Sequence, residues 1–493
     1  MTRSAGDRSG SHGRLAFVLG LAAAGSGIFA FCTHREADAQ RLDPRRPAAF
    51  VVGPAGGPAP TLRSDPRRSG AARDDLPGGP LRILWKKTLG LSVDHPALAG
   101  ADGTIAVTTG RGDVVFLDDA GTEVAHVSSG SGNAAGPATL TSDGTVVFAT
   151  TVGDVVGIRR TSARPRFVTR IGGERNARTA PLSLDDGGVV VAAGLDLVVL
   201  DAEGNVRSRV TLPEPSAAPL LVHGDRIVVV TLSGTVLGWT PGKEPVRLGS
   251  FGAPIDGGAA LYVPPHSGGD AGRGDLGGVL VAVIEGNHLV ELDLARGLRT
   301  TRAIAAQGLY LGPPSVRPGK GGGALVTLLA LTPTRGFVVT LDPGGQEIAR
   351  APVGSHAQPL LPDGGAPPLV APLHVGPLVD GRGGIAWVSP APGESKVGVV
   401  TAEGAVDVIG EAICTPRGSS SSGVTGLTPF GRGSFLVTCA GGSVTRIVGP
   451  EAENLRRSTV RVTPVRPPAG AGSGSAPPPP RPGPGGDDDD DDR

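Results

Sequence analysis

The sequence predicts an all-β fold, a β-propeller built from four-stranded antiparallel blades. A module of about 40 residues recurs between residues 82 and 450, and that length suits one blade of four short strands. Each module holds short runs of β-branched residues separated by Gly, Asp and Ser, which is the pattern of strands and hairpin turns. Helical periodicity is absent from this region, which argues against an α-solenoid.

Each module begins at a proline, except the last, where Val424 takes that place. The starting prolines are Pro96, Pro137, Pro181, Pro219, Pro254, Pro313 and Pro377. Together with Val424 they predict eight blades. Seven blades remain the alternative, because insertions at 264–274 and 353–368 stretch the later modules.

Two turn signals recur within the modules. Asp-Gly between apolar runs, as at Asp102-Gly103, predicts a tight turn, because glycine accepts the positive φ that a Cβ resists. A second signal, Leu-Asp-x-x-Gly, occurs at 117–121, 200–204 and 341–345. Its Asp can bond backbone amides while its Gly takes a left-handed position. We interpret both signals as structural and neither as catalytic.

One apolar run has no module of its own. Residues 83–89 precede the first blade, and a closed ring needs a strand from one end beside strands from the other. We predict that this run forms the outer strand of the last blade, beside residues 443–448. The stretch 458–463 competes for the same edge.

The two ends differ in composition from the middle. A basic start, an apolar run over 15–31 and Ala37-Asp38-Ala39 predict a signal peptide over 1–39, cleaved after Ala39. An uncleaved anchor or lipid attachment at Cys32 are the alternatives. Residues 40–79 are interpreted as a Pro/Gly/Arg-rich linker, a solvated tether, leading to a propeller over 80–450. Residues 451–493 are expected to be a disordered Pro/Gly-rich tail that ends in six Asp, 487–492.

Composition limits the function classes. Aromatic residues make up only 3%, so the core must be aliphatic, and 46 basic residues balance 46 acidic ones. This argues against nucleic-acid binding, which needs a basic field or stacking aromatics. Removal of the leader leaves Cys414 and Cys439, an even number that permits one disulfide in an oxidising compartment. Two buried thiols are the alternative.

The first repeat and its lead-in carry a family resemblance. Residues 62–70 (Leu-Arg-Ser-Asp-Pro-Arg-Arg-Ser-Gly), Leu84-Trp85-Lys86 and Pro96 with Asp102-Gly103-Thr104 resemble bacterial PQQ-like β-propeller proteins over about 62–450. That group includes the quinoprotein alcohol dehydrogenase-like superfamily and an envelope scaffold of the outer-membrane assembly machinery. Its repeats often carry a Trp that docks the next blade. Here only Trp85 fits that role, so we expect aliphatic packing to replace Trp docking.

The resemblance implies chemistry that this chain does not match. Quinoprotein dehydrogenases of the group hold PQQ between a Trp and a vicinal disulfide, with calcium bound by acidic and amide side chains. This sequence has no adjacent cysteines and few aromatics, so we expect no cofactor, and no catalytic, cofactor-binding or metal residues.

Weaker motifs do not change that expectation. Asp94 and His95 are neighbours, and neighbouring strand residues point to opposite faces. Lys320 lies in a Gly-rich stretch that lacks the Ser or Thr of a phosphate-binding loop. Arg-Gly-Asp occurs at 111–113 and 273–275, as chance allows in this composition.

The sequence therefore predicts an exported, non-enzymatic scaffold for protein or ligand binding in the periplasm or cell envelope of a bacterium. We expect a monomer whose partner is another envelope protein, with membrane contact only if the leader stays uncleaved. The insertions at 264–274 and 353–368 are the candidate partner loops. An enzyme or cofactor sensor that uses the central channel is the alternative.

Overall fold

The structure is a computed structural model of the chain. It describes residues 57–172, 179–264, 277–303, 309–319, 323–332, 335–353, 375–389, 395–409, 413–414, 423–431 and 433–452. Several predicted features lie outside these residues: the leader with its cleavage after Ala39, Cys32, Lys320, the second Arg-Gly-Asp, the stretch 458–463 and the acidic tail. Most of the two insertions lies outside them as well.

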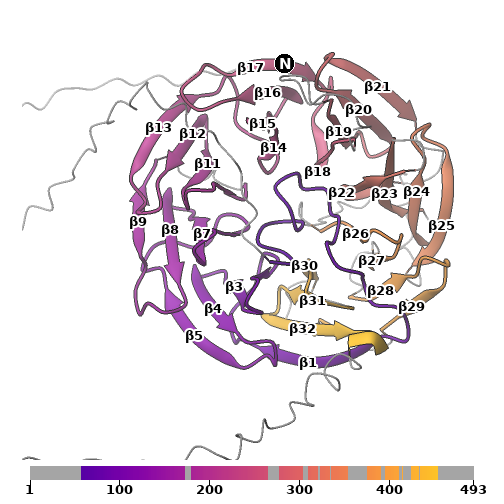
Figure 1. Ribbon diagram of the computed structural model, residues 1–493, viewed down its shortest axis with the longest axis horizontal. Helices are drawn as coiled ribbons and strands as arrows, with labels where there is room; N and C mark the ends of the chain where they lie inside the picture. The colour runs from indigo at the N-terminus through magenta and orange to yellow at the C-terminus, as the bar shows by residue number, and fades with distance from the viewer. Residues whose placement is uncertain are drawn as a thin grey trace, which may run out of the picture. The chain divides into compact units, whose positions relative to one another are not determined.

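The described strands form eight four-stranded antiparallel sheets that follow one another around a ring (Figure 1). The predicted propeller is therefore confirmed, with eight blades and not seven. Every blade begins within a few residues of its predicted start. The turn residues that end each strand act locally, so they can be identified from the sequence.

Blades 1 to 4 follow the chain order without interruption. Their strands are β2 (Leu98–Ala99), β3 (Ile105–Thr108), β4 (Asp113–Leu117) and β5 (Glu123–Ser128); β6 (Thr139–Leu140), β7 (Thr145–Ala149), β8 (Asp154–Arg159) and β9 (Phe167–Arg170); β10 (Leu182–Ser183), β11 (Val189–Ala193), β12 (Asp196–Leu200) and β13 (Val206–Thr211); β14 (Leu221–His223), β15 (Arg226–Val230), β16 (Thr235–Trp239) and β17 (Val246–Ser250).

Blades 5 to 8 complete the ring. Their strands are β18 (Ile255–Tyr262), β19 (Val279–Ile284), β20 (His288–Asp293) and β21 (Leu298–Ala303); β22 (Leu309–Pro318), β23 (Ala324–Leu331), β24 (Gly336–Leu341) and β25 (Glu347–Val353); β26 (Leu378–Val379), β27 (Ile385–Val388), β28 (Val397–Val400) and β29 (Val406–Val408); β30 (Val424–Pro429), β31 (Ser434–Cys439), β32 (Ser443–Val448) and, from the other end of the chain, β1 (Arg82–Thr88).

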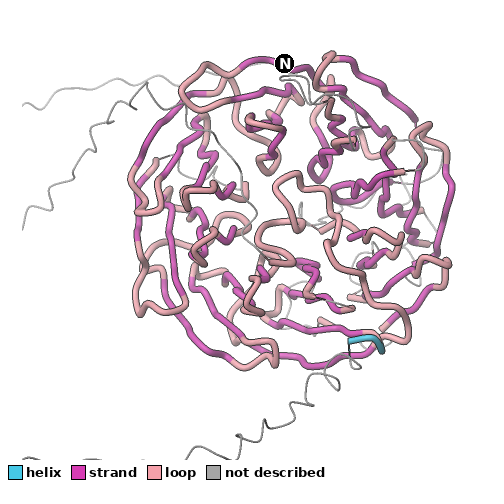
Figure 2. The backbone as a smooth tube through the Cα atoms, viewed as in Figure 1, coloured by secondary structure: helices cyan, strands magenta, loops and turns pink. Residues whose placement is uncertain are grey.

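Strands and turns account for almost all of the described chain, and a single helical turn stands at 450–452 (Figure 2). No helix within the described ranges has the length and apolar character that a membrane crossing requires.

Blade 8 closes the ring with a strand from each end of the described chain. Strand β1 pairs antiparallel with β32, from Arg82 opposite Val448 to Thr88 opposite Ser443. The predicted closure by the N-terminal run is confirmed. A disulfide joins Cys414, in the loop after β29, to Cys439 of β31, so blades 7 and 8 are also linked covalently.

The core lies between the blades. Phe116 of blade 1 belongs to one buried cluster with Val146 and Phe148 of blade 2, and Val115 of blade 1 belongs to another with Leu436 of blade 8. Because both faces of a sheet are covered by its neighbours, β3, β7 and β11 are buried along their whole length. This explains why their sequences are continuous aliphatic runs.

Contacts between neighbouring blades also use the motif glycines. The indole of Trp85, on the outer strand of blade 8, lies over Gly121 in the third turn of blade 1, and its Nε1 donates to Asp119 O at 3.0 Å. Phe167 of blade 2 lies in the same way against Gly204 of blade 3.

Arg302 of blade 5 likewise lies against Gly345 of blade 6. These glycines end the three Leu-Asp-x-x-Gly turns. We expected aliphatic packing between the blades in place of Trp docking. The contacts are instead partly aromatic and polar, because a Trp, a Phe and an Arg each occupy the space that a glycine leaves open.

We predict that Gly121→Ala destabilises the fold more than Gly144→Ala. Both glycines have φ near +80° (81° and 79°), so holding an alanine in this left-handed conformation lowers the stability of either variant by about 1–2 kcal/mol. At Gly121 the added Cβ would also lie 2.7 Å from the Trp85 ring, whereas nothing lies within 4 Å at Gly144. Overpacking adds about 1–3 kcal/mol.

Denaturant unfolding of the two variants measures this difference. Equal loss of stability in both would contradict a docking role for Gly121.

Candidate functional site

Residues 59–76, which we call the axial segment, precede β1 in the chain and cross the middle of the ring (Figure 1). The backbone carbonyls of the segment accept hydrogen bonds from the innermost strands of six blades. The pairs are Ala59 O with Ala99 N (2.8 Å), Pro60 O with Leu140 N (2.7 Å), Pro66 O with Val222 N (3.1 Å), Arg67 O with Leu261 N (3.0 Å), Ser69 O with Val316 N (2.8 Å) and Gly70 O with Val379 N (2.9 Å).

The segment then passes toward the rim between blades 7 and 8. Leu76 N donates to the buried Asp380 carboxylate in blade 7 at 2.8 Å, and Gly433 N of blade 8 donates to Asp75 O at 3.0 Å. With Pro181 of blade 3, which accepts from Arg68 Nη2 at 3.3 Å, the segment contacts all eight blades.

We expected a solvated tether over 40–79, but residues 59–76 form this axial segment inside the ring. The physical reason is that each innermost strand is an edge strand with N–H groups facing the axis. Buried N–H groups need acceptors, and a chain poor in apolar side chains can still provide carbonyls.

Arg63 is one of two buried cations in the axial segment, with a fractional exposure of 5%. Its Nη2 donates to Pro314 O at 2.8 Å and to Ser315 Oγ at 2.7 Å, and its Nε donates to Arg68 O at 3.2 Å. Its Nη1 has no hydrogen-bond partner among the described residues and lies against Gly376, so the space beside it is filled by backbone.

Arg68 is the second buried cation, with a fractional exposure of 1%. Its Nε donates to Leu220 O at 3.1 Å, and its Nη1 donates to Leu62 O at 3.0 Å and to the hydroxyl of Thr61. The planar fork of a guanidinium suits such bonding to several carbonyls at once.

One carboxylate accompanies these two cations. Asp65 is partly buried and accepts from Ser69 N at 3.0 Å. Burial lowers the pKa of Arg63 to about 9 and the pKa of Arg68 to about 10, while the charge of Asp65 opposes both shifts. The nearby charge of Arg68 also lowers the pKa of Arg63. Both guanidinium groups stay protonated at neutral pH, and main-chain oxygens offset the unfavourable burial of their charge.

The groups that PQQ chemistry would need do not come together. Cys414 and Cys439 form a disulfide, but they are 25 residues apart and not vicinal. Trp387 is fully buried in the core around blade 7. Within the described ranges no three His, Cys, Asp or Glu side chains are grouped to hold a metal ion. The described residues therefore do not fit a quinone cofactor with its calcium.

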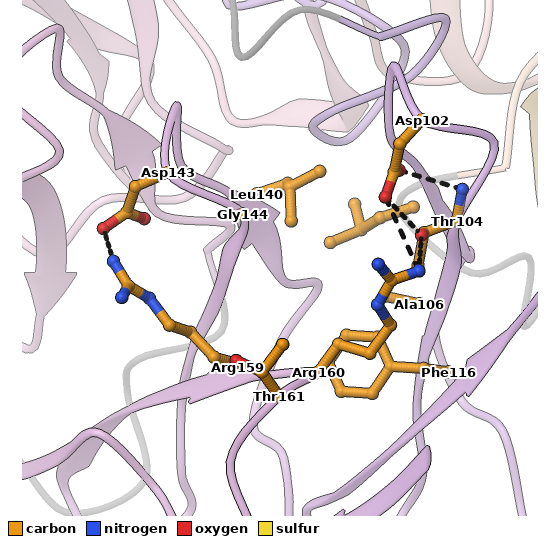
Figure 3. A pocket seen from close by; sticks show the side chains of 11 residues that line it. Asp102, Thr104, Ala106, Phe116, Leu140, Asp143, Gly144, Arg159, Arg160 and Thr161 are labelled. Carbon is orange, nitrogen blue, oxygen red and sulfur yellow. Dashed lines mark hydrogen bonds and ion pairs between the residues drawn. The ribbon is translucent and has the colours of Figure 1, made fainter. Parts of the chain in front are cut away.

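A cavity of about 190 Å³ lies between blades 1 and 2, lined by Phe116 and Leu140 and by charged side chains (Figure 3). Those charges pair with one another: Asp143 with Arg159, and Asp102 with Arg160 at 3.6 Å. Partial burial alone would raise the pKa of Asp143.

Hydrogen bonds from Thr141, Thr145, Arg166 and Arg159 outweigh that burial and hold the pKa of Asp143 well below its usual range. The charged side chains that line the cavity thus neutralise one another. As predicted, Asp102 and Asp143 act as turn residues, each accepting a bond from a backbone N–H two residues on.

The other sequence candidates are dispersed. The pKa of Asp94 is raised by burial, and the pKa of His95 is lowered to about 4 by burial, which a backbone hydrogen bond with Ala134 opposes. Within the described ranges, neither residue belongs to a group of three His, Cys, Asp or Glu side chains that could hold a metal ion. Arg111 and Gly112 lie in the turn between β3 and β4, with Gly112 at φ 79°, and Asp113 begins β4.

Sequence reasoning missed Arg63 and Arg68. Both residues lie in the stretch that we interpreted as a Pro/Gly/Arg-rich linker, although residues 62–70 also carry the family resemblance. That stretch was the only available signal.

The sequence matches no protein-family model and no curated protein sequence. Among solved structures, the chain is similar to BamB from Moraxella catarrhalis, with 16% identity, a TM-score of 0.51, and coverage of 76% of this chain and 98% of BamB. It is also similar to a quinohemoprotein alcohol dehydrogenase from Pseudomonas putida HK5, with 12% identity, a TM-score of 0.54, and coverage of 83% and 82%.

A third similar structure is a europium-containing methanol dehydrogenase, with 11% identity, a TM-score of 0.54, and coverage of 81% and 99%. Identities this low show the fold alone. The fold of the PQQ-like propellers, predicted from the sequence, is confirmed.

We predict that Arg68→Ala destabilises the protein by about 2–4 kcal/mol, because several buried carbonyls lose their donor. Arg67→Ala is the matched control. The Arg67 side chain is exposed, so its loss should change stability by no more than about 0.5 kcal/mol. Guanidinium chloride unfolding compares the two, and equal effects would contradict the anchoring role of Arg68.

We also predict that stability falls as the pH drops from about 6.5 to 4. The pKa of His95 is lowered to about 4 in the folded protein, so across this range the unfolded chain binds a proton that the folded chain does not. The loss should reach about 1–2 kcal/mol after allowance for partial solvent exposure.

His95→Gln should remove this part of the pH dependence, whereas His126→Gln, on the outer strand β5, should keep it. Denaturant midpoints at pH 7 and pH 4.5 provide the measurement. An unchanged profile in His95→Gln would contradict the assignment.

Proposed function

We propose that this chain is an exported, non-enzymatic scaffold that binds another protein of the bacterial cell envelope. The observation that carries the proposal is the axial segment. Its backbone and the buried guanidinium groups of Arg63 and Arg68 occupy the ring centre, where a propeller with a channel ligand would hold it. The outer faces and loops of the ring are then the surfaces left for binding.

Two further observations support this proposal. The sequence begins with a pattern typical of a secretory leader, and the disulfide between Cys414 and Cys439 suits an oxidising compartment. The similar dehydrogenases share the fold, but the vicinal disulfide that the family resemblance implies for PQQ binding is missing from this sequence. The competing function, an enzyme or cofactor sensor using the channel, would need the axial segment to leave its place.

The test uses the full chain in its bacterial host. Alkylation of thiols in intact cells, followed by mass spectrometry, should find Cys414 and Cys439 oxidised in the envelope fraction. Photo-cross-linking residues placed at exposed positions around the ring should give a product with one envelope protein from some positions and not from others.

Titration of the purified protein with PQQ and calcium should show no binding. Tight PQQ binding, or dehydrogenase turnover with an artificial electron acceptor, would overturn the proposal in favour of the enzyme.

A further inference from the structure

A second cavity, of about 600 Å³, lies between blades 3 and 4. Its lining comes from the end of β13 and the residues that follow it, from Thr235 and Leu237 of β16, from Glu244 and Pro245 before β17, and from Arg247 of β17. The outer strands β13 and β17 are neighbours along the ring (Figure 1). We call this cavity with its rim the blade 3–4 groove.

Two exposed aliphatic side chains stand in turns next to the groove. Leu195 is 45% exposed and Leu232 is 55% exposed. The two leucines sit in turns fixed to residues beside the cavity: Leu212 N donates to Leu195 O at 2.6 Å, and Leu232 N donates to Pro215 O at 3.1 Å. These bonds hold both exposed leucines next to the hollow, where a bound segment could cover them.

The charged side chains that line the groove do not form ion pairs with one another. Glu214, Glu244 and Arg247 line it, and none of them forms an ion pair with any described residue. Glu214 accepts from Ser233 N at 3.0 Å, and hydrogen bonds from Ser233 lower its pKa, so it is ionised at neutral pH. The cavity between blades 1 and 2 differs, because its Asp and Arg side chains pair with each other.

The charges follow one another along the groove. Glu214 contacts the turn that precedes β16, Glu244 stands in the turn after it, and Arg247 pairs in register with Leu237 in the middle of that strand. Two carboxylates against one guanidinium leave the groove with a net negative charge.

We propose that the blade 3–4 groove binds an extended segment of a partner protein that carries aliphatic side chains next to lysine or arginine. The aliphatic side chains would cover Leu195 and Leu232, and the basic ones would face Glu214 and Glu244. Apolar contact flanked by complementary charge gives such a segment both affinity and orientation. This inference rests on the proposed function, since it names the surface and the partner chemistry of the scaffold.

A defined probe tests the chemistry. A fluorescein-labelled peptide of alternating leucine and lysine is titrated with the full chain and followed by anisotropy, beside the same peptide with glutamate in place of lysine. We expect the lysine peptide to bind at least about tenfold more tightly, and its affinity to fall as salt is raised. Equal affinities, or tighter binding of the glutamate peptide, would overturn the proposal.

Variants with matched controls locate the binding. The double variant Glu214→Gln with Glu244→Gln should weaken the lysine peptide by about tenfold, whereas Glu403→Gln, at an exposed turn of blade 7, should not. Leu232→Ser should also weaken it, whereas Leu298→Ser, 61% exposed on the outer strand of blade 5, should not. Thermal unfolding checks that each variant is folded, and equal effects in variants and controls would overturn the assignment.

Two outcomes separate this inference from the proposed function. If cells yield a cross-linked envelope partner from other positions but not from Leu195 or Leu232, the groove assignment fails while the scaffold stands. If the purified chain forms a dimer that Leu232→Ser abolishes, the groove belongs to a second copy and the proposal is overturned. Tight binding of PQQ would instead contradict the scaffold itself.

Discussion

The inner edges of the blades impose the strongest constraint on this structure. Each innermost strand has one neighbour inside its own sheet, so its other side presents N–H and C=O groups to the axis. The axial segment satisfies many of them with its own backbone, as in the bonds from Val316 N to Ser69 O and from Val379 N to Gly70 O. Eight blades far apart in the sequence are thereby held to one short stretch of chain.

The two buried arginines follow from the same constraint. Carbonyls at or near the starting prolines, such as those of Pro181 and Pro314, face the axis, and the guanidinium groups supply the donors that they need. Burying two cations beside one partly buried carboxylate is unfavourable unless neutral oxygens surround them. This arrangement makes the centre of the ring a structural element.

The third turn of the blade shows how one residue can satisfy two requirements. Gly121 and Gly204 take the left-handed conformation that their turns need, at φ 81° and 85°. The missing Cβ also makes room for Trp85 and Phe167 from the preceding blade. The absence of a Cβ thus serves both the turn and the contact between blades. This explains why the motif recurs where bulky outer-strand residues dock.

The sequence by itself determined the eight blades, the turns and the closing strand, because these depend on periodicity and turn residues that act within a few positions. It also shows that no two cysteines are adjacent, whereas the family resemblance implies a vicinal disulfide for PQQ binding. Only the tertiary structure placed Arg63 and Arg68 at the ring centre, because the stretch that contains them has the composition of a solvated linker. Their partners lie far along the chain, Pro377 being 314 residues from Arg63, and no local pattern records such a pairing. The same holds for the blade 3–4 groove, because Glu214 and Glu244 line one cavity only when blades 3 and 4 are packed side by side.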